Sequence, residues 1–432
     1  MARPLEGVRL PGGSSLPPNL ERLGRTLMKL AEGPSLSPGL AEGELGRAWK
    51  ELLECSATAS AFLSPEWLLP WWQVYGPTQG RQPWIFTYWR GGRLIGFAPL
   101  SLRTHYPRYQ IPLRRWEIWG SGEAEADAVC SDYLNVLALP GAEADVAAGL
   151  EHCLRTSPLG HELVIPLMDM SSQQTLALQQ AFLARGWWMQ IEQPTESRWI
   201  ELPTSWEAYL AARKASSRYW IRRTLRDLQQ WAGSTLLVRE AQRPEELPFL
   251  QEHLIRLHQE RWQGTSGGTF RSRLFLAFHR RIQEQWLARG QLQLAVLWGH
   301  AQPIAAVYNL YWRDQVLFYQ CGRSLQVPRG LRPGAWILAW SVQQAIARRF
   351  RRFDFLGGVA SYKAQFASEV RRLAQVRFQR PGIRTAVQRL IEHAKQTRRV
   401  WLAGCPGWSS SVENTVDEPP ESDQNSGANR IR

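Results

Sequence analysis

Lys363 is the residue whose chemical type stands out most clearly from the rest of the sequence. Only five of the 52 basic residues are lysine, at positions 29, 50, 214, 363 and 395, and the others are arginine. A surface cation in such a chain would normally be arginine, so this position indicates a site that uses a compact ammonium on a flexible stem. Such a group could hold a phosphate or carboxylate of a substrate. The simpler alternative is an ion pair with Glu369.

A second candidate is an arginine-rich loop that ends where a helix is predicted to start. The loop at residues 322–332 precedes a helix predicted at 333–349, and it contains Arg323, Arg329, Gly330 and Arg332. The helix opens with Pro333, Gly334 and Ala335, and proline fits the first position because its missing N–H would be unpaired there anyway. A helix N-terminus flanked by arginines suits a pyrophosphate. Any helix that begins with Pro-Gly would nevertheless look like this.

The helix predicted to run to Trp231 carries a third basic feature. Arg218, Arg222 and Arg226 follow one another four residues apart, with Arg223 beside them. Like charges at this spacing repel by about a few tenths of a kcal/mol per pair, so an anionic ligand or acidic neighbours must offset them. Binding of phosphate or polysaccharide and a plain solvated surface explain this stripe equally well.

The basic character of the chain belongs to its second half. The formal net charge is +14, and residues 201–400 contain 33 basic against 13 acidic residues, whereas the remainder contains 19 and 25. Such a field favours anionic partners such as phosphorylated cofactors, nucleotide sugars, acidic polysaccharide, RNA or a lipid surface. The alternative is that arginines only cover solvated helix surfaces.

Composition narrows the class of protein further. With 432 residues, 44% of them hydrophobic and 21% charged, the chain is predicted to be globular with two domains. The five cysteines lack the spacing of metal or redox motifs, so we expect reduced thiols and no metal. No run of 18 apolar residues and no secretory signal occurs, which predicts a cytoplasmic protein with peripheral membrane contact at most.

The ordered part of the chain contains two similar hairpins. In the first half, PWIFTYW is followed by the turn RGG and then by RLIGFAPLSLR. In the second half, LQLAVLW is followed by GH and then by AQPIAAVYNLYW. Each hairpin pairs a strand that ends in tryptophan with a glycine turn and a returning apolar strand. Any two hairpins share such features, but the match in order and length favours duplication.

The remaining elements complete a mixed pattern of strands and helices. Thr204 to Glu207 form a capping box that opens the helix ending near Trp231. Strands are predicted at WEIWG, DYLNVLAL, 187–193, 315–321, 353–356 and 375–379. Helices are predicted near 20–30 and at 143–155, 171–185, 248–262, 275–289, 333–349 and 385–400. This order predicts an α+β fold with mostly antiparallel sheets and crossover helices.

Several of these segments resemble the GNAT acyltransferase superfamily. They are QPIAAVYNLYWRDQVLFYQCGRS, RPGAWILAWSVQQAIARRFRRFDFLGGVASYKAQF, HQERWQGTSGG, FLSPEWLLPWW and GRLIGFAPL. More narrowly, they are similar to the acetyltransferase domain of CelD-type polysaccharide-biosynthesis proteins, which is related to Fem-type peptidyl transferases. The resemblance covers about residues 50–380 and implies two tandem GNAT-like domains, each a mixed, mostly antiparallel sheet flanked by helices.

The resemblance also implies domain limits. It divides the chain into an irregular segment at 1–45, an N-terminal GNAT-like domain at 46–195 and a C-terminal GNAT acyltransferase domain at 196–382. A C-terminal helix at 383–404 and a disordered tail at 405–432 would follow.

The resemblance implies roles for individual residues. An acceptor would attack an acyl thioester where strands 316–321 and 353–356 separate, and strand N–H groups would hold the carbonyl oxygen. Asp354, Tyr319 and Tyr362 would orient the acceptor or relay its proton. The substrate would contact Lys363, Arg218, Arg222 and Trp262. Simple core packing of Tyr319 and a turn-capping role of Asp354 are the alternatives.

The acyl donor implied by the resemblance is acetyl-CoA or another acyl-CoA. Its phosphates would contact Arg329, Gly330, Arg332, Gly334 and Ala335, although Arg332 stands where the family's loop has its first glycine, so the loop departs from the usual pattern. The predicted activity is transfer of an acyl group to an amine or hydroxyl of an anionic cell-envelope or exopolysaccharide precursor. The alternatives are a Fem-like transferase that uses aminoacyl-tRNA, and an inactive GNAT pair that binds an anionic polymer.

Overall fold

The computed structural model describes residues 24–30, 40, 42–106, 111–262 and 268–403. The chain divides into two compact units, residues 1–385 and 386–432. The second unit, as far as it is described, continues the helix α12 (Ile383–Ala403). The predicted disordered tail at 405–432 and most of the irregular segment at 1–45 lie outside the described residues. No helix in the described ranges is long and apolar enough to cross a membrane.

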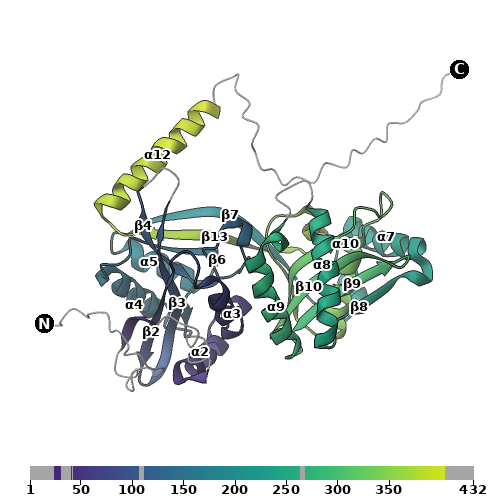
Figure 1. Cartoon of the computed structure of the whole chain (residues 1–432), viewed down its shortest axis with the longest axis horizontal. Coiled ribbons are helices and arrows are strands. Elements are labelled where there is room, and N and C mark those ends of the chain that lie inside the picture. Colours follow the sequence, from purple (N-terminus) through teal and green to yellow (C-terminus); the bar gives the residue numbers. More distant parts are fainter. Residues whose placement is uncertain (1–23, 31–39, 41, 107–110, 263–267, 404–432) are drawn as a thin grey trace. The chain divides into compact units, whose positions relative to one another are not determined.

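In the described part of the first unit, thirteen strands form one sheet (Figure 1). Their order is β1-β2-β3-β4-β6-β13-β7-β12-β11-β10-β9-β8, and β5 pairs with β3. The first strands are β1 (Arg25–Lys29), β2 (Gln82–Arg90), β3 (Arg93–His105), β4 (Leu113–Ile118), β5 (Leu137–Ala138), β6 (Glu162–Asp169) and β7 (Trp188–Glu201). The others are β8 (Leu237–Glu240), β9 (Leu292–Gly299), β10 (Gln302–Trp312), β11 (Gln315–Arg323), β12 (Arg352–Gly357) and β13 (Glu369–Gln379).

The same succession of elements occurs twice along the sheet. In each half an antiparallel hairpin leads to a third strand, a helix crosses over, and the next strand pairs parallel with the third. The crossover helices are α4 (Glu143–Thr156) and α10 (Pro333–Ala347). The α+β class and the similarity of the two hairpins are therefore confirmed.

The two halves exchange their last strands. β7 follows β6 in the chain but pairs with β12 and β13, while β13 pairs with β6 and β7. Figure 1 shows β7 and β13 side by side where the two halves meet. Residues from both halves therefore come together at the centre of the sheet.

Helices cover both faces of the sheet. They are α2 (Glu44–Cys55), α3 (Pro65–Tyr75), α5 (Gln173–Leu183), α6 (Trp206–Ala211), α7 (Ala215–Ala232), α8 (Leu247–Arg261), α9 (Arg273–Leu287) and α11 (Ser361–Phe366), besides α4, α10 and α12. One buried cluster includes side chains of α2, α3, α8 and α9 and runs through both halves, and a second lies among α7, α10 and strands β9 to β12.

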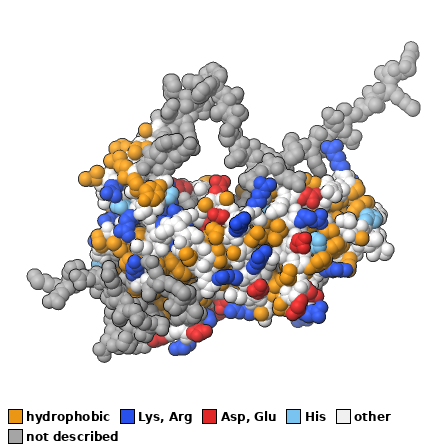
Figure 2. Space-filling view, viewed as in Figure 1, with side chains coloured by type: hydrophobic (Ala, Val, Ile, Leu, Met, Phe, Trp, Pro, Cys, Tyr) orange, Lys and Arg blue, Asp and Glu red, His pale blue; other side chains and the backbone are white. Residues whose placement is uncertain are grey.

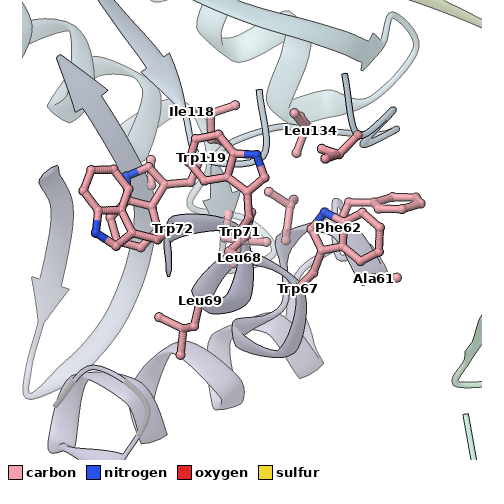
Figure 3. Packing of buried hydrophobic residues seen from close by; sticks show 14 of the residues in the cluster. Ala61, Phe62, Trp67, Leu68, Leu69, Trp71, Trp72, Ile118, Trp119 and Leu134 are labelled. Atoms are coloured by element: carbon pink, nitrogen blue, oxygen red, sulfur yellow. The ribbon is translucent and has the colours of Figure 1, made fainter. Parts of the chain in front are cut away.

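Tryptophans hold the larger cluster together around α3. Ser64 caps this helix by accepting a hydrogen bond from the backbone N–H of Trp67, at 3.3 Å. The rings of Trp72 and Trp119 stack with their centroids 4.5 Å apart, and Figure 3 shows them with Trp67 and Trp71. Trp67 also meets Phe278 of α9 edge to face at 4.9 Å, so aromatic packing joins the two halves.

Three sequence predictions are wrong in detail. The helix predicted near residues 20–30 is the strand β1, because pairing with β2 satisfies its backbone. The helix predicted from 204 to 231 is divided into α6 and α7, its N-cap is Ser205, and Lys214 between the helices is extended. Of the predicted strand DYLNVLAL only Leu137–Ala138 is a strand, and Tyr133 has a φ of 57°.

Candidate functional site

The sheet opens between β11 and β12. The two parallel strands are paired only where Gln315, Val316 and Leu317 lie beside Arg352, Phe353 and Asp354. Beyond these pairs β11 continues to Arg323 against β10, and β12 continues to Gly357 against β7. The edge of β11 that faces β12 therefore keeps backbone N–H and C=O groups that a bound molecule could pair with. The predicted separation of these strands is observed.

A tight turn follows β12 and is held by Lys363. The Nζ atom of Lys363 donates to the backbone oxygens of Leu356, Gly357 and Gly358 at 3.3, 3.0 and 2.9 Å. Leu356 and Gly358 have φ values of 57° and 106°. The three donors of the ammonium are thus used by the turn, and the side chain is only 7% exposed. Lys363 holds the shape of the site here, and no ion pair with Glu369 is seen.

Asp132 enters this site from the first half of the chain. Its Oδ2 accepts a hydrogen bond from the backbone N–H of Gly357. Burial raises the pKa of Asp132 to about 7, although the Gly357 N–H and the nearby Lys363 ammonium act in the opposite direction. The pKa of Lys363 is lowered, because the effect of burial exceeds the opposite effect of the nearby Asp132 and Asp354 carboxyl groups. A carboxyl with a pKa near neutrality can exchange a proton at ordinary pH.

Asp354 lies beside Tyr133 of the first half. The Tyr133 hydroxyl donates to Oδ2 of Asp354 at 2.7 Å and lies 2.7 Å from Oγ of Ser197. Oδ1 of Asp354 accepts from the backbone N–H of Leu356 at 2.7 Å, so the residue also caps the turn. Burial raises the pKa of Asp354, and the bonds from Tyr133 and Leu356 together with Arg371 and Arg352 lower it.

A pocket of about 160 Å³ opens next to Asp354. Its walls come from the segments 57–62 and 133–135, from the ends of β6 and β10, from β11 to β13 and from the N-cap of α5. They include Thr58, Tyr133, Asn135, Asp169, Ser172, Trp312, Gln315, Leu317, Arg352, Asp354 and Arg371. Both halves of the chain contribute to this pocket, so it forms only when they assemble.

Tyr319 is placed in an aromatic core. Its hydroxyl bonds to the backbone oxygen of Val129 and lies 3.0 Å from Nε2 of His279, whose Nδ1 lies 3.2 Å from the Tyr308 hydroxyl. Burial raises the pKa of Tyr319 well above its usual value and lowers that of His279 well below. A neutral imidazole that links two tyrosines accounts for these contacts. Tyr319 is thus part of the packing beneath the site.

Tyr362 is not among the residues that line the pocket. It lies against the cluster formed by α7, α10 and the neighbouring strands. Of the three residues predicted to orient the acceptor, the structure therefore places only Asp354 beside the pocket.

The predicted phosphate-binding residues lie together at the start of α10. Arg329 and Gly330 are exposed, and Nη1 of Arg332 donates to the backbone oxygen of Gly330 at 3.2 Å. No side chain caps the helix N-terminus. A Cβ atom added to Gly334 would meet only the Arg323 side chain, at 3.5 Å, so the backbone of Gly334 and Ala335 is approachable.

The predicted substrate contacts are dispersed. Arg222 is exposed and Arg218 is half-buried on α7, where Nη1 of Arg218 lies 3.5 Å from the backbone oxygen of Ala211. Asp227 pairs with Arg223 and Arg226, which supplies an acidic neighbour for the stripe. Trp262 stacks under the guanidinium of Arg261, and that guanidinium lies 3.0 Å from Sγ of Cys321. Figure 2 shows Lys and Arg scattered among acidic and apolar side chains on the face in view.

The sequence did not reveal the contribution of the first half. Asp132, Tyr133 and Ser197 belong to segments interpreted as a strand or not considered. The only signal for the first two was a polar group, SDYLN, that interrupts an apolar segment. Their closeness to Asp354 depends on contacts across 221 positions of sequence.

The comparisons with known proteins agree with this geometry. Residues 215–364 match a family model described as Acetyltransferase (GNAT) domain. This segment is therefore similar to GNAT acetyltransferase domains. It includes α7, the open strands β11 and β12, the N-terminus of α10 and Lys363. A search of curated proteins gave no match.

The chain is also similar to several solved structures. The crystal structure of FemX is 10% identical, with a TM-score of 0.55, and the match covers 80% of this chain and 98% of FemX. A tandem GNAT protein from the clavulanic acid biosynthesis pathway is 12% identical over 83% of this chain and 100% of its own, with a TM-score of 0.45. L-PGS from Bacillus licheniformis is 12% identical over 80% and 96%, also with a TM-score of 0.45. The likeness to FemX shows a shared fold, and the predicted fold class, a mixed and mostly antiparallel sheet flanked by helices, is confirmed.

Proposed function

We propose that this protein is a GNAT-type acyltransferase that moves an acyl group from acyl-CoA to an amine or hydroxyl of a cell-envelope or exopolysaccharide precursor. The observation that carries the proposal is the opening between β11 and β12, with Asp132, Asp354 and Lys363 at its start. A thioester lying in this opening would meet free strand N–H groups and two carboxyl groups. The CelD-like subtype and the polysaccharide acceptor rest on the sequence resemblance.

The residues at the start of α10 fit the phosphates of a CoA thioester. The first-turn N–H groups of a helix lack intrahelical acceptors, and Gly334 leaves them approachable. Arg323, Arg329 and Arg332 supply positive charge, and the Arg332 guanidinium lies 5.7 Å from the Trp220 ring centroid. The equivalent helix of the first half, α4, starts with Glu143 and Asp145, which would repel phosphates. The donor is thus expected in the second half only.

The chemical step follows from the two carboxyl groups. Asp354 orients the acceptor, and Asp132, whose pKa is about 7, accepts a proton from it. The acceptor nitrogen or oxygen forms a bond to the thioester carbonyl carbon while the carbon–sulfur bond breaks. N–H groups of β11 stabilise the oxygen on which negative charge develops. The leaving thiolate takes up the proton, so the products are the acylated acceptor and CoA.

Lys363 would act as a positioning residue in this scheme. By holding the backbone oxygens of residues 356–358 it fixes the turn that presents the N–H of Gly357 to Asp132. Its ammonium also offsets the charge of Asp132 once that carboxyl ionises. The domain limits 46–195 and 196–382 belong to the proposal as well, with Arg218, Arg222 and Trp262 as outer substrate contacts.

A Fem-like transferase that uses aminoacyl-tRNA is the second candidate. The fold likeness to FemX and the excess of basic residues at 201–400 favour it. An inactive binding module would need neither carboxyl group, so the presence of both Asp132 and Asp354 at the opening argues against that third alternative.

Thermal-shift titration with acetyl-CoA, longer acyl-CoAs and charged tRNA tests the proposal. We expect a rise in Tm with at least one CoA thioester and none with charged tRNA. CoA release followed with a thiol reagent would then identify turnover. The proposal fails if no thioester shifts the Tm, and a shift with charged tRNA alone would favour the Fem-like alternative.

A further inference from the structure

The helix α12 carries an exposed apolar stripe among basic residues. We infer that this stripe binds the surface of a membrane that contains anionic lipids, with α12 lying between the headgroups and the acyl chains. The inference concerns an interaction surface of the chain and does not depend on the proposed acyl transfer.

The apolar residues at the start of α12 follow one another at helical spacing. Ile383, Val387, Leu390, Ile391 and Ala394 occupy positions i, i+4, i+7, i+8 and i+11, so they share one side of the helix. The helix continues without a break for 21 residues (Figure 1). The stripe therefore extends over about three turns and is more than a single exposed apolar residue.

This apolar stripe faces solvent in the described structure. Ile383 is 85% exposed and Leu390 is 70% exposed, and the other members of the stripe are exposed or half-buried. On α7, Ile221 and Leu228 have the same spacing of seven residues and are fully buried. An amphipathic helix of a globular protein normally turns its apolar side to the core, as α7 does. The opposite arrangement on α12 points to a binding partner for its apolar side.

The polar side of α12 is bonded near the start of the helix. Oγ1 of Thr385 lies 2.6 and 2.9 Å from the backbone oxygens of Arg380 and Gly382. Nε2 of Gln388 donates to Oε1 of Glu392 at 2.8 Å. Thr385 and Gln388 are both buried. The polar side is thus occupied, whereas the apolar side is accessible to a partner.

The charge of α12 favours an anionic surface as this partner. The helix contains five basic residues and one acidic residue, Glu392, which gives a formal net charge of +4. The basic residues are Arg384, Arg389, Lys395, Arg398 and Arg399. A layer of anionic headgroups attracts all of these charges together, while the acyl chains beneath it take up the apolar stripe.

The composition of α12 fits a helix that lies on a membrane. It has too many charged residues to cross a bilayer. Its last turns contain Val400, Trp401 and Leu402, and tryptophan is enriched where headgroups and acyl chains meet. Basic amphipathic helices of low mean hydropathy bind in the plane of this interface. We therefore expect binding that is reversible and sensitive to salt.

Flotation of the full chain with lipid vesicles tests the inference. Vesicles of phosphatidylglycerol and phosphatidylcholine in equal parts are compared with vesicles of phosphatidylcholine alone. We expect at least about tenfold tighter binding to the anionic vesicles, and loss of most of this binding at about 0.5 M NaCl. In Leu390→Glu, binding to the anionic vesicles should fall at least about tenfold, because an apolar side chain that enters the acyl layer is lost. Ile383→Glu should have the same effect.

Leu176→Glu is the matched control. Leu176 is 46% exposed on the helix α5, and the substitution changes the net charge by the same amount. This variant should bind the anionic vesicles as tightly as the parent. Equal binding of the parent to both kinds of vesicle, or binding to neither, would overturn the inference. So would a loss in Leu176→Glu as large as in Leu390→Glu, or full binding of both α12 variants, which would assign the contact to another basic surface.

Light scattering of the same samples distinguishes a second copy of this chain as the partner. A monomer that floats only with anionic vesicles supports the membrane contact. A dimer that does not float, and that Leu390→Glu converts to a monomer, would overturn it in favour of self-association through α12.

Discussion

Asp132→Asn should make the protein more stable at alkaline pH while abolishing most of its activity. The folded pKa of about 7 lies above the usual value of 3.8, so the folded protein holds a proton that the unfolded chain has lost. Stability contributed by this proton is complete below pH 4 and is lost as the pH rises to 7. The full loss is about 4 kcal/mol at 1.36 kcal/mol per pH unit. Asparagine resembles the protonated carboxyl and avoids the loss.

The effect can be measured as a difference between two pH values. Between pH 5 and pH 8 the gain in unfolding free energy of Asp132→Asn over the parent should grow by about 3 kcal/mol. Urea titration followed by tryptophan fluorescence reports unfolding directly, because the chain has 22 tryptophans. The control Asp314→Asn, at an exposed carboxyl that pairs with Arg351, should show no such growth. A gain that is the same at both pH values would refute the assignment of a buried, proton-holding carboxyl.

Activity provides a second measure of the same residue. If Asp132 is the base, kcat of the parent should rise with pH, with a midpoint near pH 7, and then level off, because only the ionised carboxylate accepts a proton. In Asp132→Asn this rise should disappear, and kcat should fall by about 10²- to 10⁴-fold. An Asp132→Asn variant with unchanged kcat and an unchanged pH profile would show that another group accepts the proton.

Three further variants test separate parts of the structure. Lys363→Arg should lower the free energy of unfolding by about 1–3 kcal/mol in urea titration and reduce kcat, because a guanidinium cannot replace the ammonium among three backbone oxygens. If neither the unfolding free energy nor kcat changed, Lys363 would be an ordinary surface cation. Gly322→Ala should lower the Tm and reduce the free energy of unfolding by about 1–3 kcal/mol, because the new Cβ would lie 2.5 Å from the backbone nitrogen of His258. An unshifted Tm would disprove this close approach of α8 and β11. Arg329→Ala should raise KM for acyl-CoA about five- to tenfold and make this KM less dependent on salt concentration. The control Arg256→Ala, at an exposed position on α8, should change neither property. Equal effects of the two substitutions would refute the phosphate site at α10.

Local patterns in the sequence determined most of the elements. The apolar strands on either side of RGG and GH predicted the two hairpins, and the apolar stretch that begins with Pro333 and Gly334 predicted α10 almost to the residue. Proline, glycine and arginine at the start of that helix also identified its exposed N-terminus. Such features depend on neighbours a few residues apart, which a single sequence displays.

The partners of Asp354 were decided only by the tertiary structure. The exchange of β7 and β13 brings Asp132, Tyr133 and Ser197 of the first half against Asp354 and the turn at 356–358. No local pattern encodes a contact across more than 200 positions, and the raised pKa of Asp132 exists only because folding removes it from water. Tyr319 is buried in the core, and the buried Lys363 uses its three donors on backbone oxygens. Neither outcome could be predicted from neighbouring residues in the sequence. Residue types thus predicted which groups could react, whereas long-range packing selected those that meet.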